Sequence, residues 1–386
     1  MTPAFKPRTV QELADYVAIG AKLEIVGRGT KRGLGRPLQA ETALDMSGFT
    51  GISLYEPEEL VLEAGAGTPL SEIERALAKN HQQLAFEPPD YSKLLGVHHR
   101  GTLGGLMACG LSGPRRIKAG AARDHILGLA GVSGRGEIFK AGGRVVKNVT
   151  GFDVAKLMTG SYGTLAALTS ITVKVLPAAQ TEETLVFSGL SDARAVQAMS
   201  LAMQSACEVS GAAHLPGIPA KTLFRLEGIQ PSVVYRRQKL ASHLKIFGAS
   251  DHLDEKESRA EWKAIRDVER LSADDARFVW KLSITPSKAA ETVARISKQL
   301  DVQYFYDWAG GLVWLGVPRS NQAYAYIIRT CVQDGHATLF RAEDEVRERI
   351  EVFQPQPPAL SALTRRIKAS FDPNGVYNHG RMYKDI

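Results

Sequence analysis

Three glycine-rich segments limit what this chain can fold into more than any other feature of its sequence. They are VGRGTKRGLG at 26–35, GAGT at 65–68 and GTLGGLMACGLSGPRR at 101–116. The first two follow short apolar runs that are typical of buried strands. Glycine adopts positive φ and lets backbone N–H groups approach a phosphate closely. The pattern therefore predicts strands linked by loops that wrap an anionic nucleotide.

Two nucleotide-binding motifs are excluded by the residues in these loops. No GxxxxGK[ST] occurs, so the chain has no P-loop motif. GAGT precedes a helix, as a dinucleotide fingerprint would, but Leu70 replaces the third glycine. Pro69 lacks an N–H, and Glu72 and Glu74 put negative charge where a pyrophosphate would bind. We therefore interpret GAGT as a structural turn.

The other two loops have the chemistry of a phosphate site. In the first, Thr30 offers a hydroxyl, while Arg28 and Lys31 offer positive charge. Taken alone, that loop could equally be an ordinary turn after a strand. The second loop keeps its side chains small and adds the Thr102 hydroxyl. Two separate loops of this kind suit a long ligand that contains a diphosphate.

The charge favours anionic ligands or acidic partners but does not indicate nucleic acid. Lys and Arg number 48 against 41 Asp and Glu, a net charge of +7. The chain has no zinc-finger spacing, RNP motif or long basic tail. Arg115, Arg116, Lys118 and Arg123 form the densest basic stretch, which is either a solvated loop face or a surface for phosphate or a partner.

Cysteine usage and hydropathy indicate the cytoplasm. The three cysteines, Cys109, Cys207 and Cys331, are far apart in the sequence. This spacing fits a reducing compartment, and three scattered cysteines cannot hold an iron–sulfur cluster. The first residues contain no apolar leader, and no run of about 18 apolar residues occurs. We therefore expect neither export nor membrane spanning.

A change in composition near residue 178 predicts a domain boundary. The sequence is dense in glycine from 96 to 177, and afterwards strands and helices alternate in recognisable units. Two strand–helix–strand sets between 184 and 341 resemble a ferredoxin-like antiparallel sheet with helices on one face. We expect an α+β protein with domains at 1–178 and 179–350 and a tail at 351–386.

Together these segments resemble the FAD-binding fold of the vanillyl-alcohol oxidase type, also called PCMH. Within it, the chain is similar to the family of FAD-binding subunits of bacterial glycolate oxidases. The resemblance runs through both glycine loops, GAGTPLSEIERAL, FEPP, GAARDHILG, the segment 142–177 and the ending FDPNGVYNHGRMY. It implies FAD bound between two α+β subdomains, with a ferredoxin-like sheet as substrate or cap domain. It covers nearly all of 1–178 and the tail.

The resemblance also implies positions for the cofactor. It puts the diphosphate on the loop of Gly27, Arg28, Gly29, Thr30 and Lys31. Along the pyrophosphate and flavin it puts Gly101, Thr102, Gly104, Gly105 and Ala108, with Gly163 and Thr164 beside them. Ile171 and Val173 would flank the adenine through their backbone, and Asn378 would return near the isoalloxazine. The family's Asn-Pro-Gly-Arg is Asn-His-Gly-Arg at 378–381 here. The first loop has no His or Cys, so we expect FAD to be non-covalent.

The sequence assigns no catalytic residue and no metal. Related 2-hydroxy-acid oxidases carry an HxGDGNxH-like histidine cluster, which is missing here. His98 and His99 precede the second loop and could face the flavin or simply the solvent. Arg341 could hold a substrate carboxylate or be an ordinary surface charge. The aromatic residues at 304, 306, 308 and 314 could form core or an interface.

Three functions follow as hypotheses. The first is an FAD-binding subunit of a glycolate oxidase complex that oxidises glycolate, a small 2-hydroxy acid, to glyoxylate, with glycolate oxidase D and iron–sulfur subunits as partners. Electrons would pass through flavin to the iron–sulfur subunit, and the complex would touch the bacterial inner membrane only peripherally. The second is a self-sufficient FAD-dependent oxidase or dehydrogenase for another 2-hydroxy acid or alcohol. The third is a scaffold subunit with an empty flavin site.

Overall fold

A computed structural model describes residues 4–144, 152–274, 276–319 and 324–386. The chain forms two compact units. Unit 1 comprises Met1–Ser112, Gly120–Pro177 and Glu343–Ile386, and unit 2 comprises Gly113–Ala119 and Ala178–Ala342. The segment 113–119 therefore belongs to unit 2, although both of its sequence neighbours lie in unit 1. No pattern in the sequence predicts that this segment belongs to unit 2.

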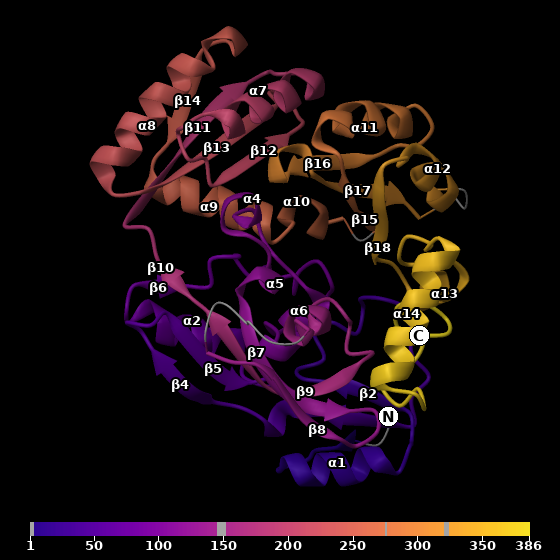
Figure 1. Ribbon diagram of the computed structural model, residues 1–386. Coiled ribbons are helices and arrows are strands. Elements are labelled where there is room, and N and C mark those ends of the chain that lie inside the picture. The colour runs from indigo at the N-terminus through magenta and orange to yellow at the C-terminus, as the bar shows by residue number, and fades with distance from the viewer. Residues whose placement is uncertain (1–3, 145–151, 275, 320–323) are drawn as a thin grey trace. The chain divides into compact units, whose positions relative to one another are not determined.

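Unit 1 contains a small parallel sheet and a larger antiparallel one (Figure 1). The parallel sheet has the order β1-β3-β2, with β1 Ala4–Phe5, β2 Leu23–Val26 and β3 Thr42–Asp45. The antiparallel sheet has the order β4-β5-β9-β7-β8, with β4 Ile52–Glu56, β5 Val61–Gly65, β7 Ile126–Ser133, β8 Ile138–Gly142 and β9 Ala166–Lys174. A further pair joins β6 Gln82–Gln83 to β10 Leu176–Pro177.

Unit 1 contains seven α-helices among the described residues. They are α1 Val10–Ala18, α2 Leu70–Ala78, α3 Leu103–Cys109, α5 Ala122–His125, α6 Val154–Met158, α13 Asp344–Arg349 and α14 Pro358–Phe371. Thr9 caps α1 by accepting a hydrogen bond from the N–H of Glu12, as its capping-box spacing indicates. Leu13 and Val17 of α1 are buried in a core with Leu44 and Tyr377. This core lies against the parallel sheet that carries the first glycine loop.

The tail of unit 1 is held by a buried ion pair. Lys368 Nζ lies 2.6 Å from Asp372 Oδ2, and it also donates to the carbonyls of Thr164 and Tyr377. Asp372 in turn accepts hydrogen bonds from the N–H groups of Val376 and Tyr377. Tyr377 forms a parallel bridge with Leu23 of β2. The tail thereby reaches the strand that precedes the first glycine loop.

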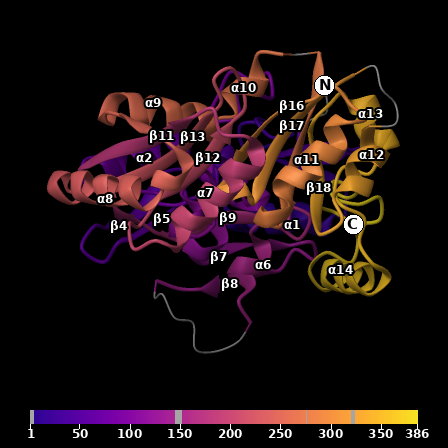
Figure 2. The ribbon, with the colours of Figure 1, turned by 90° about the horizontal axis from the view of Figure 1, so that it is seen from above.

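Unit 2 is built on one eight-stranded antiparallel sheet. Its order is β14-β11-β13-β12-β16-β17-β15-β18. The strands are β11 Thr181–Ser188, β12 Gly211–Leu215, β13 Lys221–Gly228, β14 Ser250–Leu253, β15 Arg277–Ile284, β16 Gln303–Asp307, β17 Leu312–Pro318 and β18 Gly335–Arg341. The helices are α4 Arg116–Ala119, α7 Asp192–Gln204, α8 Gln230–His243, α9 Glu255–Arg266, α10 Glu269–Ser272, α11 Ala289–Ser297 and α12 Tyr324–Cys331. Figure 2 shows α7 beside α11 on this sheet.

The prediction that helices cover only one face of this sheet was wrong. Gly211 and His214 of β12 lie on opposite faces, because side chains alternate along a strand. His214 meets Asp192 of α7, while a Cβ on Gly211 would lie 2.9 Å from the ring of Trp262 in α9. Helices therefore pack on both faces. Among the described residues, no helix is long and apolar enough to cross a membrane.

Candidate functional site: a cavity between the glycine loops

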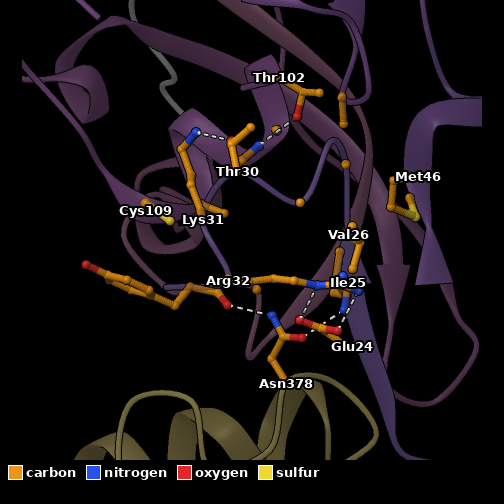
Figure 3. A pocket seen from close by; sticks show the side chains of 18 of the residues that line it. Glu24, Ile25, Val26, Thr30, Lys31, Arg32, Met46, Thr102, Cys109 and Asn378 are labelled. Atoms are coloured by element: carbon orange, nitrogen blue, oxygen red, sulfur yellow. Dashed lines mark hydrogen bonds and ion pairs between the residues drawn. The ribbon is translucent and has the colours of Figure 1, made fainter. Parts of the chain in front are cut away.

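A cavity lies within unit 1, between the first glycine loop and α3 (Figure 3). It is lined by β2 and its loop, α3, the turn before β9, and the tail. Of the predicted residues, those that line it are Gly27, Arg28, Gly29, Thr30, Lys31, Thr102, Gly104, Gly105, Ala108, Gly163 and Asn378. The fold thus brings together segments from both ends of the chain.

The first loop presents backbone donors to this cavity. The N–H groups of Arg28, Gly29, Thr30 and Lys31 make no hydrogen bond within the described part of the chain. Gly29 has φ +69°, which lets the loop curl without steric strain. Consecutive backbone donors on a curled loop form an anion-binding concavity. This loop therefore suits a phosphate group.

The second loop contributes space rather than donors. The N–H of Leu103 donates to Thr68 O at 3.0 Å, and that of Gly104 donates to Ala66 O at 2.7 Å. Thr102 caps α3 by accepting from the N–H of Gly105 at 3.3 Å. A Cβ on Gly104 would lie 2.8 Å from Ala66 O, so only glycine fits. Gly104 is needed because β5 and α3 approach each other closely here.

GAGT behaves as the structural turn that its sequence predicts. The N–H groups of Ala66, Gly67 and Thr68 donate to carbonyls of Thr169, Phe49 and Gly65 respectively. A Cβ on Gly67 would lie 2.3 Å from Met46 O. These N–H groups are already used, although Ala66 itself lines the cavity.

Asn378 closes one end of the cavity. Its Oδ1 accepts from Ile25 N at 2.8 Å and its Nδ2 donates to Tyr162 O at 2.8 Å. A Cβ on Gly163, which has φ +70°, would lie 2.7 Å from Asn378 Nδ2. Tyr162 also has positive φ, at 55°, although it is not glycine. This strain is stabilised by hydrogen bonds from both sides, since Tyr162 N donates to Ala108 O.

Electrostatics inside the cavity favour an anion. Burial lowers the pKa of Lys31, whose ammonium contacts Thr30 Oγ1 at 3.3 Å. Burial raises the pKa of the Cys109 thiol to about 11 and also raises the pKa of the Tyr162 phenol. Figure 3 shows Lys31 and Cys109 close together and Met46 on the opposite side. The Asp90 carboxylate favours the charged form of Lys31, and a bound phosphate would stabilise this buried ammonium further.

A network of charged residues borders the same cavity. Glu24 lies 2.9 Å from Arg32 Nη2 and 3.2 Å from Arg381 Nη2. Arg381 also donates to the carbonyls of Arg32, Leu34 and Arg36. These contacts fix the tail against the outer part of the first loop. Arg381 keeps the arginine of the family's tail motif and contributes to the lining.

Four predicted cofactor residues lie outside this lining. Gly101 borders a neighbouring cavity that shares Thr30 and Lys31. Thr164 is buried, and its hydroxyl donates to Ser161 O at 2.7 Å. Ile171 and Val173 are buried in β9, which pairs with β5 and β7 on its two sides. Their role toward the adenine stays a prediction.

The other candidates fall in different places. His99 borders the neighbouring cavity and His98 is exposed. Arg341 donates to the carbonyls of Asp274 and Arg277, so its guanidinium holds the start of β15. Arg115 pairs with Glu227 at 2.7 Å within unit 2, and Arg116 stacks on Trp308.

Several lining residues escaped the sequence interpretation. They are Glu24, Ile25, Val26, Arg32, Leu34, Met46, Ala66, Cys109, Tyr162, Ala166, Leu168 and Arg381. Cys109 and Tyr162 directly follow and precede predicted residues, so adjacency alone could have suggested them. Leu168 gave no local signal, because it belongs to a run of apolar residues, and Met46 gave none because it stands alone between Asp45 and Ser47.

The fold, the cavity and the comparisons together define a class of protein. The family model for the FAD binding domain matches residues 3–142. The solved structure of p-cresol methylhydroxylase with substrate bound matches with a TM-score of 0.74 at 14% identity, covering 99% of this chain and 88% of that one. The chain thus contains an FAD binding domain and has the fold of p-cresol methylhydroxylase, and the predicted α+β fold class is confirmed.

Two relatives identify the family to which the chain belongs. Glycolate oxidase subunit GlcE of Escherichia coli strain K12 is 34% identical over 382 residues, which cover 98% of this chain and 97% of that protein. Glycolate oxidase subunit GlcD of Bacillus subtilis strain 168 is 30% identical over 185 residues, covering 47% of this chain and 38% of that protein. The chain belongs to the glycolate oxidase subunit GlcE family.

The cavity fits the cofactor that this family model names. Four unused N–H groups and the Lys31 ammonium suit a diphosphate, and the apolar side chains of Ile25, Val26 and Met46 suit a flat ring system. At Gly27 a Cβ would lie 2.7 Å from Thr102 Oγ1, so the loops could not approach each other with a larger residue. These features are those that FAD needs.

Proposed function

We propose that this chain is the FAD-binding subunit of a glycolate oxidase complex, which oxidises glycolate to glyoxylate. The observation that carries the proposal is similarity to GlcE over 98% of this chain, combined with a cavity that presents unused backbone N–H groups and the Lys31 ammonium. Bound FAD supplies the two-electron redox chemistry. The protein's contribution is to hold it and to set its surroundings.

Individual residues have distinct roles in this proposal. The N–H groups of the loop 28–31 and the Lys31 ammonium bind the diphosphate. Gly105 leaves room beside it, and Asn378 keeps the tail in place at Ile25. The Cys109 thiol stays protonated at neutral pH, because burial raises its pKa to about 11.

The same proposal assigns partners. GlcE and GlcD are each named as a subunit, which supports a multi-subunit assembly for this chain. The chain has no cysteine motif for an iron–sulfur cluster, so electrons leave through an iron–sulfur subunit, and the GlcD-type subunit is the other partner. The absence of an HxGDGNxH-like segment supports a role in which this chain carries flavin beside the GlcD-type subunit. Peripheral contact with the inner membrane would follow from the complex.

The test is the visible spectrum of the purified chain, followed anaerobically as glycolate is added. Flavin released by denaturation is identified as FAD or FMN. We expect bound FAD that glycolate alone does not bleach and that bleaches once the GlcD-type subunit is added. Bleaching of the isolated chain by glycolate would instead make it a self-sufficient oxidase. A chain that stays colourless with added FAD would support the scaffold alternative and contradict the proposal.

A further inference from the structure

A lysine lies among aromatic side chains on the sheet of unit 2. Lys281 of β15 is paired with Trp314 of β17 on one side and with Thr338 of β18 on the other. Trp314 is in turn paired with Phe305 of β16. Residues directly opposite on neighbouring strands share a face. Phe305, Trp314, Lys281 and Thr338 therefore form one row across four strands.

Trp308 and Arg116 complete the surroundings of Lys281. The Lys281 ammonium lies 5.1 Å from the centroid of the Trp308 ring and 5.8 Å from that of Trp314. The Arg116 guanidinium lies 4.3 Å from the Trp308 centroid. Trp308 is fixed because its indole N–H donates to Gly113 O at 3.0 Å. The segment 113–119 thus brings a second cation to the same indole.

The Lys281 ammonium forms no ion pair or hydrogen bond in the described part of the chain. The Asp307 carboxylate still favours its charged form. Burial, with Arg116 acting in the same direction, lowers the pKa of Lys281 to about 8. The side chain is only partly buried and Arg116 is exposed, so solutes can reach both. A positive charge in apolar surroundings is most strongly stabilised by an incoming anion.

Hydroxyl groups beside Lys281 define the ligand further. Thr338 is its cross-strand neighbour, and Ser283 follows two residues later on the same face. Ser283 is paired with the exposed His336. These side chains offer neutral polar groups next to the two cations. Such a surface matches a small molecule with one carboxylate and an adjacent hydroxyl or carbonyl oxygen.

We propose that Lys281, Arg116 and Trp308 form a binding site for a small 2-hydroxy or 2-oxo carboxylate in unit 2. The Lys281 ammonium binds the carboxylate, Arg116 adds positive potential across the indole, and Thr338 hydrogen-bonds the neighbouring oxygen. The choice of this ligand class rests on the proposed function, because glycolate and glyoxylate belong to the class. Its assignment as an anion site depends on unit 2 alone.

The test measures binding to the full chain by calorimetry and by indole fluorescence, with glycolate and oxalate as probes. We expect Lys281→Gln to weaken the binding of glycolate and of oxalate by roughly tenfold to a hundredfold, since a charge-assisted hydrogen bond is lost. Lys281→Arg should restore part of the affinity. Lys288→Gln is the matched control, because Lys288 is exposed and lies 3.8 Å from Glu291. FAD content is measured in every variant to report on folding of unit 1.

A second readout keeps the test independent of flavin chemistry. Amine-reactive labelling at pH 8, mapped by mass spectrometry, should modify Lys281 readily, and oxalate should protect it but not Lys288. Unchanged carboxylate affinity in Lys281→Gln, with FAD content intact, would overturn this proposal without touching the flavin assignment. Absence of FAD with carboxylate binding retained would overturn the proposed function and leave this site standing.

Discussion

Asn378 binds the backbone N–H of Ile25 at 2.8 Å, across 353 positions of the sequence. The same amide donates to Tyr162 O at 2.8 Å. One side chain thus joins the strand before the first glycine loop, the turn before β9 and the tail. These three segments line the cavity, so its shape depends on this residue.

Replacing Asn378 by Ala should therefore loosen the cavity. The change leaves Ile25 N and Tyr162 O without partners, which should lower the free energy of unfolding by about 3 kcal/mol. FAD affinity should fall as well. Denaturant unfolding and FAD titration measure the two effects. Asn374→Ala is the control, because Asn374 is exposed and lies four residues earlier; equal loss in both variants would contradict this role.

Two adjacent glycines should respond differently to the same substitution. A Cβ on Gly104 would lie 2.8 Å from the Ala66 carbonyl, whereas a Cβ on Gly105 would lie no closer than 3.5 Å to Thr102 Oγ1. Gly104→Ala should destabilise the chain, despite the roughly 1 kcal/mol that Ala normally gains in a helix. Gly105→Ala should keep the stability of the FAD-free chain and weaken FAD binding, because it fills cavity space.

Thermal unfolding with and without FAD separates these two glycine variants. If Gly105→Ala binds FAD as tightly as the unmodified chain, the cofactor does not lie along α3.

Lys31→Met should move FAD affinity and FAD-free stability in different directions. Burial lowers the pKa of Lys31, so the charged form costs free energy in the folded chain at every pH below its unfolded value of about 10.4. Removing the charge should therefore leave the melting temperature unchanged or raise it. FAD affinity should fall by roughly tenfold or more, with a weaker salt dependence. Lys79→Met, at an exposed position, should change neither.

Cys109 should react slowly with alkylating reagents in the folded chain. Burial raises its pKa from 9.0 to about 11, although Lys31 and Arg381 act in the opposite direction. The thiolate fraction at pH 8 is then lower by roughly a hundredfold than for an unperturbed thiol. Iodoacetamide labelling mapped by mass spectrometry gives the rate. Rapid labelling at neutral pH, or no further protection by FAD, would show that the thiol does not face the cofactor.

Glu227 should contribute to the acid stability of unit 2. Burial opposes its ionisation, but Arg225 and Arg115 lower its pKa to about 2. A depressed carboxyl pKa stabilises the fold above the unfolded value of about 4.3, and that stability is lost as pH falls toward 2. The amount is up to about 3 kcal/mol. In Glu227→Gln the free energy of unfolding should therefore fall less steeply as the pH drops toward 2.

Glu208→Gln is the control for this loss of stability at low pH. Glu208 is 63% exposed and pairs with Lys118, so its contribution is screened by solvent. Chemical denaturation between pH 2 and 6 compares the two variants. If Glu227→Gln loses stability at low pH just as the unmodified chain does, another buried carboxylate dominates the pH dependence of stability.

Local features of this protein were determined by the sequence alone. Thr9 caps α1, a helix follows GAGT from Leu70, and the first glycine loop follows a strand at the cavity. Each of these depends on residues within a few positions of one another, so spacing and residue type suffice to predict it.

Only the tertiary structure decided which groups the cavity can use. The sequence predicts phosphate chemistry in the second glycine loop, yet Thr68 and Ala66 of another segment already accept the N–H groups of Leu103 and Gly104. Cys109, Met46 and Asn378 line one cavity because distant segments pack together, and the segment 113–119 joins unit 2 for the same reason. Such contacts depend on the summed packing of many side chains, which no local pattern in the sequence records.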